Sequence, residues 1–197
     1  MKSVDAITSK LFNNLTKNYY KYKVNNNIKD SSRIFFIERI LQAENNIYLF
    51  GMNFQNYFTK DNSILEAFKE LDKNKKKLNI YIYIPDKNVL KEIENYIIYK
   101  KKNIFYLKNR NLLKIINNRF TYLEIKVIVY NKFYKFGASA IDLNTKNSFL
   151  HLSKVNRKEY IGNASFFNFV YNDSNKLLIE FVYKFFKKIE KSGKEIK

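Results

Sequence analysis

One stretch decides the fold: residues 119–142, which read RFTYLEIKVIVYNKFYKFGASAID. The part from Leu123 to Val129 is mostly β-branched and apolar, which is typical of a strand covered on both faces. Residues 133–141 then predict a returning strand, so we expect a β-hairpin in the middle of a sheet. Side chains alternate along a strand, which places Glu124 and Lys126 on the same face. Burying such a pair is expensive, so it is either functional or located at the exposed end of the strand.

Strand and helix patterns alternate on both sides of this stretch. We predict strands at 46–52, 78–84, 104–107, 149–153 and 164–171, and helices at 3–20, 32–43, 62–74, 86–97, 110–117 and 174–189. Strands that alternate with helices favour crossover connections and helices on both faces of the sheet. The expected fold class is therefore α/β, with a mixed, mostly parallel sheet. Residues 1–30 would be an N-terminal helix and linker, and residues 31–193 the α/β domain.

The helix faces and caps follow from periodicity and turn chemistry. The helix at 32–43 should bury Ile34, Ile37 and Leu41, and Asp86 should cap the helix that it precedes. Asp173 or Ser174 should cap the last helix, which presents a broad apolar face that begins at Leu177. The charged tail from Glu190 is expected to fray.

The chain is strongly basic. It carries 37 Lys and Arg against 18 Asp and Glu, a formal charge of +19. Such an excess favours a polyanionic partner, either nucleic acid or an anionic membrane surface. Basic stretches at 73–77, 99–102 and 154–158 interleave with Tyr96, Tyr99, Tyr106 and Tyr160, a mixture that can grip a phosphate backbone and stack bases. The abundance of Lys, Asn, Ile, Tyr and Phe is equally what an AT-rich genome encodes, which would make the lysines a solvated surface.

Several function classes are excluded by composition. There is no cysteine and only one histidine, His151, so disulfides, thiol nucleophiles and zinc sites built on several histidines are ruled out. We predict no cofactor and no metal. The first residues lack a signal-peptide core, and no apolar run reaches the ~20 residues of a membrane-spanning helix, so we expect a soluble, cytoplasmic protein.

The central stretch resembles the phospholipase D-like superfamily, whose strand motif is His-x-Lys-x4-Asp followed by a Gly-Ser-x-Asn turn. Laid on the sequence from Glu124, the lysine of that motif falls on Lys126 and the serine on Ser139. Its histidine falls on Glu124, its aspartate on Asn131 and its final asparagine on Ile141. The resemblance implies the fold of that superfamily over roughly residues 32–190, and a homodimer, because single-motif members pair to complete a site.

The departures from the motif imply that the chemistry is lost. In that family the histidine attacks phosphorus, and the lysine stabilises charge on the phosphoryl oxygens. A glutamate at position 124 would repel a phosphodiester. What the resemblance then implies is a scaffold with a residual anion pocket near Lys126 and Ser139.

Further candidate residues lie outside the motif. His151 and Lys154 could serve a nearby cleft, although three residues apart they cannot share a strand face. Asn53, after the first predicted strand, and Asp86, after the second, lie where α/β sheets place ligand-binding groups. A lone histidine between leucines is more often a core residue, and Asp86 is more simply a helix cap.

Three hypotheses follow. The leading one is a catalytically degenerate phospholipase D-like domain that acts as a binding, sensor or assembly module. The alternative is a nucleic-acid-binding protein or nuclease that uses the basic surface. The third is an active phosphodiesterase that uses His151 with Lys126 and Lys154.

Overall fold

The computed structural model describes residues 36–51, 64–96, 120–154, 166–171, 173 and 175–196. The predicted helices at 3–20 and 110–117 and the predicted strand at 104–107 lie outside these residues. Among the described residues, no helix combines the length and the apolarity that crossing a membrane requires.

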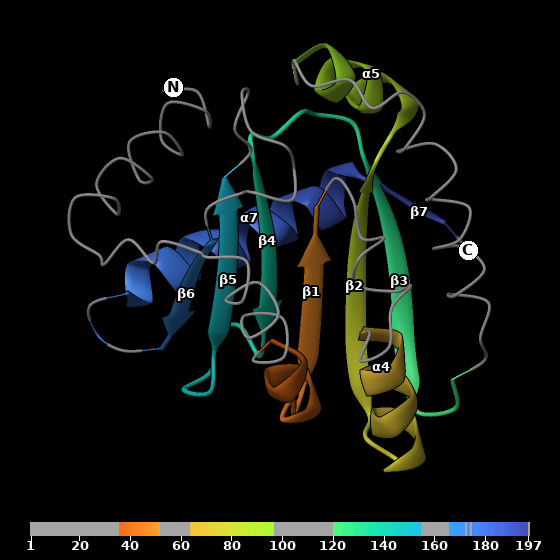
Figure 1. Cartoon of the computed structure of the whole chain (residues 1–197), viewed down its shortest axis with the longest axis vertical. Coiled ribbons are helices and arrows are strands. Elements are labelled where there is room, and N and C mark those ends of the chain that lie inside the picture. The colour runs from red at the N-terminus through yellow and green to blue at the C-terminus, as the bar shows by residue number, and fades with distance from the viewer. Residues whose placement is uncertain are drawn as a thin grey trace, which may run out of the picture.

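A seven-stranded sheet forms the centre of the molecule, in the order β6-β5-β4-β1-β2-β3-β7 (Figure 1). Its strands are β1 (Asn46–Phe50), β2 (Leu78–Pro85), β3 (Leu123–Tyr130), β4 (Phe136–Ile141), β5 (Phe149–Lys154), β6 (Phe166–Val170) and β7 (Lys194–Ile196). Only the β1–β2 and β2–β3 pairs are parallel, and the other neighbouring pairs are antiparallel. The predicted α/β class and mixed sheet are confirmed, but the sheet is mostly antiparallel and not mostly parallel.

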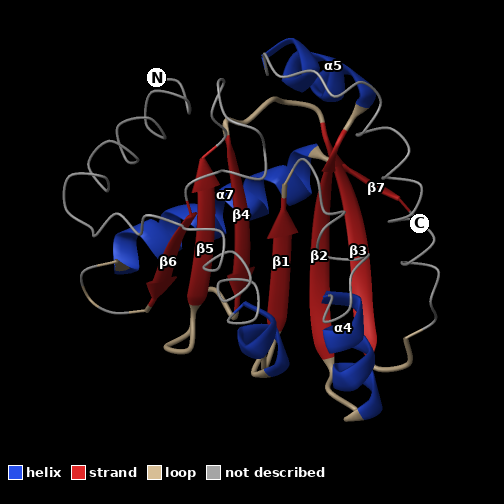
Figure 2. Ribbon diagram, viewed as in Figure 1, coloured by secondary structure: helices blue, strands red, loops and turns tan. Residues whose placement is uncertain are grey.

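The predicted β-hairpin is not formed. Strands β3 and β4 both exist, but β2 and β1 lie between them in the sheet. β3 instead pairs in parallel with β2 along its whole length, from Leu78 opposite Leu123 to Pro85 opposite Tyr130. Residues 131–135, which we call the crossing segment, run over the ends of β2 and β1 (Figure 2). Five extended residues reach about 17 Å, enough for the roughly 14 Å of three strand spacings.

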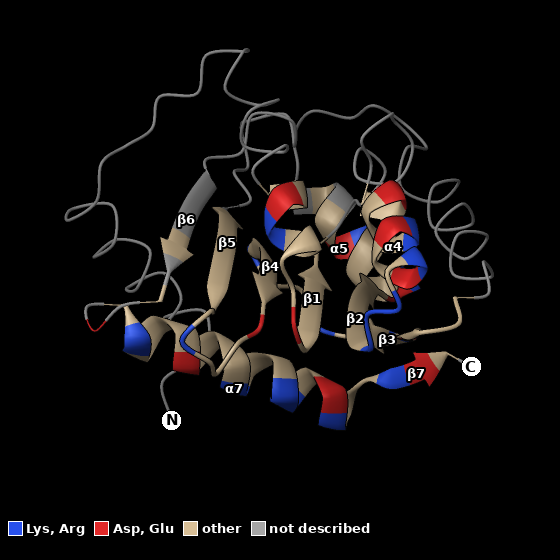
Figure 3. Cartoon of the chain, turned by 90° about the horizontal axis from the view of Figure 1, so that it is seen from below, with Lys and Arg blue, Asp and Glu red and all other residues tan. Residues whose placement is uncertain are grey.

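Helices cover both faces of the sheet, as predicted. Helix α7 (Lys176–Ser192) is the described helix on one face, while a helical turn at 36–41 and α4 (Ile64–Lys73) lie on the other (Figure 3). We call these the α7 face and the α4 face. Helix α5 (Lys87–Tyr96) lies beyond the end of the sheet, where Asp86 caps it: its Oδ1 accepts a hydrogen bond from the backbone N–H of Val89 at 2.8 Å.

Strand alternation divides the core into two clusters. Tyr48, Tyr83, Ile128 and Leu150 point to the α7 face and pack with Phe186 and the rest of that helix. Their neighbours Leu49, Ile82, Val127 and Phe149 point to the α4 face. The sheet is therefore covered on both sides, which is why its strands are apolar nearly throughout.

Two predicted helix faces are partly wrong. The turn at 36–41 buries Phe36 and Ile40, whereas Leu41 is 39% exposed. In α7 the predicted Leu177 is 79% exposed. The N-cap residue of α7 is Asn175, not Asp173 or Ser174. Leu178 and Ile179, the next two residues of α7, are buried against the sheet.

The tail predicted to fray is ordered into the sheet. α7 continues to Ser192, and β7 then pairs antiparallel with β3, Lys194 opposite Val129 and Ile196 opposite Val127. The sheet thus extends past the boundary predicted at residue 193. Gly193 makes the turn possible, because a Cβ there would lie 2.5 Å from Ile128 Cγ2 and 2.9 Å from the carbonyl oxygens of Ile189 and Val129.

Replacing Gly193 with alanine should therefore detach β7. Two of the three obstructing atoms are backbone oxygens, which cannot rotate away, and overpacking of this kind costs about 1–3 kcal/mol. We expect faster amide hydrogen exchange in β7 and along Val127–Val129, and a lower free energy of unfolding. Ser192→Ala is the control, and unchanged exchange in Gly193→Ala would contradict the account of the turn.

Candidate functional site

The predicted charged pair, Glu124 and Lys126, lies in the first half of β3 and is open to solvent. Lys126 Nζ is 2.8 Å from Glu124 Oε1, and the two side chains are 34% and 62% exposed. Both belong to the α7 face, because Ile128, two residues further along β3, packs in the cluster of that face. The hydrogen bond to Glu124 is the main reason that the pKa of Lys126 is raised. The pair is therefore open to solvent and not buried in the core, and the functional alternative stays open.

Ser139 and His151 lie on the opposite face. They are register partners on β4 and β5, and both are buried, at 7% and 5% exposure. The imidazole lies beneath Phe36, with ring centroids 5.9 Å apart. The structure thus brings Ser139 and His151 together inside the α4 face, while Lys126 lies three strand positions away from Ser139, on the other side of the sheet. The predicted joint anion pocket of Lys126 and Ser139 is therefore wrong.

Of the other predicted site residues, Asn131 joins neither group. Asn131 begins the crossing segment and is exposed. Lys154 ends β5, where its backbone is the register partner of Phe136. Asn53 lies outside the described residues, as do the basic stretches 99–102 and 155–158. Within the described part of the chain, no group of acidic or histidine side chains is placed to hold a metal ion.

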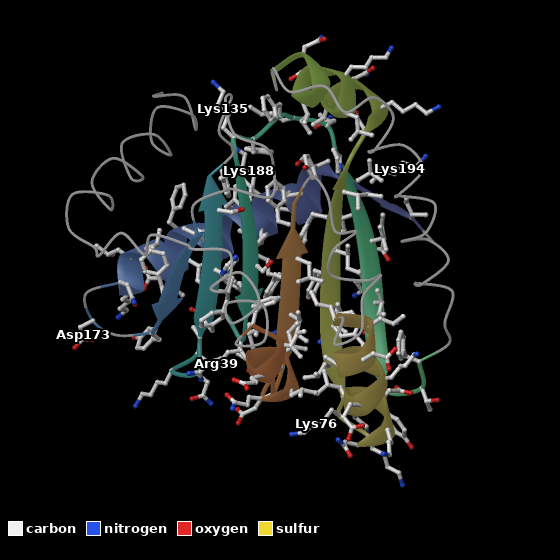
Figure 4. The ribbon with its side chains drawn as sticks, viewed as in Figure 1. Arg39, Lys76, Lys135, Asp173, Lys188 and Lys194 are labelled. Carbon is white, nitrogen blue, oxygen red and sulfur yellow. The ribbon has the colours of Figure 1, made fainter. Side chains whose placement is uncertain are left out.

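A line of exposed lysines on α7 and β7 was not predicted from the sequence. Lys184, Lys188, Lys191 and Lys194, which we call the lysine stripe, all have exposed side chains. The first three follow helical i, i+4, i+7 spacing and so share one side of α7, away from the sheet. Figure 4 shows Lys188 on α7 and Lys194 on β7, and Figure 3 shows basic segments along the C-terminal half of the helix. None of the four forms an ion pair within the described residues.

Glu190, on the same half of α7, is held on the inner side of the helix. The Tyr83 hydroxyl donates a hydrogen bond to its Oε1 at 2.9 Å, and Lys187 Nζ donates to its Oε2 at 2.7 Å. Burial, and then the charge of Glu190, raise the pKa of Tyr83 far above the physiological range, so its hydroxyl stays a donor. Burial lowers the pKa of Lys187, but Glu190 outweighs this effect and the net shift is upward. The carboxylate is thus tied to Tyr83 and Lys187 and forms no ion pair with the lysine stripe.

Beside the stripe, aromatic rings and lysines from three elements meet on the α7 face. Tyr81 on β2 stacks on Tyr48, with centroids 5.0 Å apart and planes 8° from parallel. Lys187 Nζ lies 5.2 Å and Lys126 Nζ 5.9 Å from the centroid of the Tyr81 ring. Lys187 is also 5.6 Å from the ring of Tyr183. These distances are those of cation–π contacts.

The i, i+4, i+7 lysine spacing is the signal that could have revealed the stripe. It is ambiguous in sequence, because lysines near the C-terminus of a helix also complement the helix dipole. The inward position of Glu190 depends on Tyr83, more than a hundred residues away in the chain, and could not be predicted from the sequence of the helix.

Comparison with known proteins identifies no family. No protein-family model and no curated protein matches the chain. Among solved structures, it is similar to TrmBL2, described as an archaeal chromatin protein with a novel mode of DNA binding, at 11% sequence identity and a TM-score of 0.47. The match covers 97% of this chain and 62% of that one, so this chain spans less than two thirds of TrmBL2.

Proposed function

We propose that this protein is a non-catalytic nucleic-acid-binding module and that the lysine stripe contacts the phosphate backbone. The observation that carries the proposal is the stripe itself: four exposed lysines, with the neighbouring carboxylate of Glu190 held on the inner side of α7. Aligned ammonium groups of this kind bind nucleic acid by releasing counterions from its phosphates.

The distribution of charge argues against codon bias as the whole explanation. Bias toward lysine codons acts along the whole chain, yet lysines on α4 are paired: Lys69 with Glu66 at 2.8 Å and Lys73 with Glu70 at 3.8 Å. The stripe has no such partners among the described residues. Residues 97–119 carry seven Lys or Arg and no acidic residue, so basic residues are concentrated in parts of the sequence.

Nucleic acid fits the stripe better than a membrane surface. A helix that lies in a membrane interface needs an apolar side that is available to lipid. The apolar side of α7, including Val182, Phe186 and Ile189, is buried against the sheet. On its outer side, Leu177 is the exposed large hydrophobic residue.

The positions of the candidate catalytic groups support a role without turnover. A phosphodiesterase nucleophile must reach its substrate, and His151 is buried beneath Phe36 on the α4 face. Lys126 belongs to the α7 face and is paired with Glu124. We keep a degenerate phospholipase D-like origin as part of the proposal, supported by the strand–helix order through β1, α4, β2, α5 and β3. Homodimer formation stays a prediction of that resemblance.

The test is to replace three lysines of the stripe with glutamine, as Lys184→Gln/Lys188→Gln/Lys191→Gln in the full chain. We expect affinity for a fluorescently labelled oligonucleotide, measured by anisotropy, to fall roughly tenfold or more. The slope of log affinity against log salt should lose about one for each lysine removed. All three side chains are exposed, so the thermal unfolding midpoint should change little.

A matched control removes the same charge on the other side of the sheet. Lys69→Gln/Lys73→Gln/Lys76→Gln on and after α4 should change affinity and salt slope far less. Equal losses in the two variants would mean that only net charge matters, and would contradict a localised interface. No salt-sensitive binding by the unmodified chain would contradict the proposed function itself.

A further inference from the structure

Helix α7 crosses its face of the sheet diagonally and leaves part of that face without a helix among the described residues. It runs from β6 towards the end of β3 (Figure 1), so the first halves of β2 and β3 are not beneath it. There the outward side chains are polar or aromatic: Asn79, Tyr81 and Lys126 are half-buried, and Glu124 is exposed. The half-buried Tyr183 and Lys187 border this area from α7. We call Tyr81, Lys126, Tyr183 and Lys187 the tyrosine–lysine cluster.

We propose that the tyrosine–lysine cluster is a nucleotide subsite that makes the protein prefer single-stranded over double-stranded nucleic acid. The inference rests on the proposed function, because the cluster adjoins the lysine stripe through Lys187. A strand whose phosphates follow the stripe would pass the cluster with its next nucleotide.

The aromatic rings of the cluster can stack on the bases of a single strand but not on those of a duplex. Bases in a single strand are open to stacking on aromatic side chains, whereas in a duplex they are already stacked and paired. The inner side of the Tyr81 ring rests on Tyr48, which in turn stacks on Phe186 at 5.0 Å. Tyr81 is therefore held rigidly by the core, so that little side-chain entropy remains to be lost on stacking.

The two lysines of the cluster supply positive charge for the phosphate of the bound nucleotide. Lys126 and Lys187 come from different elements and converge on the same ring, within 5.9 and 5.2 Å of its centroid. Two ammonium groups at one aromatic ring suit a phosphate that is joined to a stacking base. Lys187 also donates a hydrogen bond to Glu190, which accepts one from Tyr83 as well.

Glu124 occupies the place of the anion at Lys126. Its carboxylate is 62% exposed, and its ion pair with Lys126 is of the exposed kind that contributes little stability. A phosphate approaching Lys126 competes with this carboxylate. Removing the charge of Glu124 should therefore strengthen the binding of a single strand. The loss of a purely structural ion pair would not have this effect.

Two variants test the subsite in opposite directions. Tyr81→Leu should weaken binding of a labelled single strand by about fivefold or more, the loss expected for one stacked base, with little change for the duplex of the same sequence. Glu124→Gln should tighten single-strand binding severalfold. Glu66→Gln, which releases Lys69 on α4 with the same change of charge, is the control and should have a smaller effect.

A fluorescence measurement distinguishes a loss of binding from a loss of folding. The chain has no tryptophan, so Tyr81→Trp introduces a single reporter in the cluster. Its fluorescence should be quenched by a single strand and much less by the duplex. Equal quenching by both, or equal losses for both in Tyr81→Leu, would overturn the subsite while leaving the lysine stripe intact. If the stripe variants also bind normally, it is the proposed function that fails.

Discussion

Replacing Asp142 with alanine should lower the free energy of unfolding by about 4 kcal/mol or more, since each of its three backbone hydrogen bonds to a charged carboxylate contributes roughly 1.5–3 kcal/mol. Asp142 is 1% exposed and follows β4 directly. Its Oδ1 accepts hydrogen bonds from the backbone N–H groups of Asn45 and Asn46, and its Oδ2 accepts one from that of Glu44, all at 2.8–2.9 Å. The carboxylate thus fixes the entry into β1 to the exit from β4.

Backbone conformation adds to this effect. Asp142 has a φ of 48°, in the left-handed region that Asp and Asn tolerate better than Ala. Asp142→Asn keeps this tolerance and one acceptor oxygen, but it places an NH₂ group where the carboxylate accepted a bond. We expect about half the loss of the alanine variant, measured by chemical denaturation with an unchanged m-value. A loss below about 1 kcal/mol for Asp142→Ala would mean that other groups hold the start of β1.

The strands could be predicted from sequence because β-branched and apolar runs are local. Leu123–Val129 indicates a strand covered on both faces, whichever neighbour it has. The choice of neighbour is not local. β3 gains a full-length parallel partner in β2, and the crossing segment is just long enough to carry the chain past two strands to β4. The same strand–turn–strand pattern occurs whether the two strands pair with each other or are separated in the sheet. The hairpin prediction was wrong for this reason.

The arrangement of the candidate site residues could not be predicted from the sequence for a related reason. Lys126 and Ser139 lie on strands that are not neighbours, so their faces depend on the register of β2 and β1 between them. A shift by one residue at any of these pairings would move a side chain to the other face. The exposed position of Lys126 with Glu124, by contrast, was one of two alternatives that the local pattern left, because alternation within one strand is reliable.

Replacing Phe50 with alanine should destabilise the protein by about 3–5 kcal/mol, the range for removing a large aromatic side chain from a packed core. Phe50 is 2% exposed at the end of β1. Its ring centroid lies 4.8 Å from Tyr130, 5.2 Å from Phe185 and 5.6 Å from Phe136. It also contacts Tyr134 of the crossing segment at 5.7 Å. One ring therefore joins β3, β4, α7 and the segment that runs over the sheet.

The consequence should be local as well as global. Without the Phe50 ring, Tyr134 loses a packing partner on the sheet, so amides in residues 131–135 should exchange faster than those of β5. Phe50→Leu refills most of the volume and should lose clearly less, while Phe181→Ala, at a half-buried position on α7, is the matched control for deleting a phenyl group. If Phe50→Ala and Phe181→Ala cost the same, the end of the sheet is held by the backbone of the crossing segment. In that case the aromatic cluster around Phe50 contributes no more than ordinary burial.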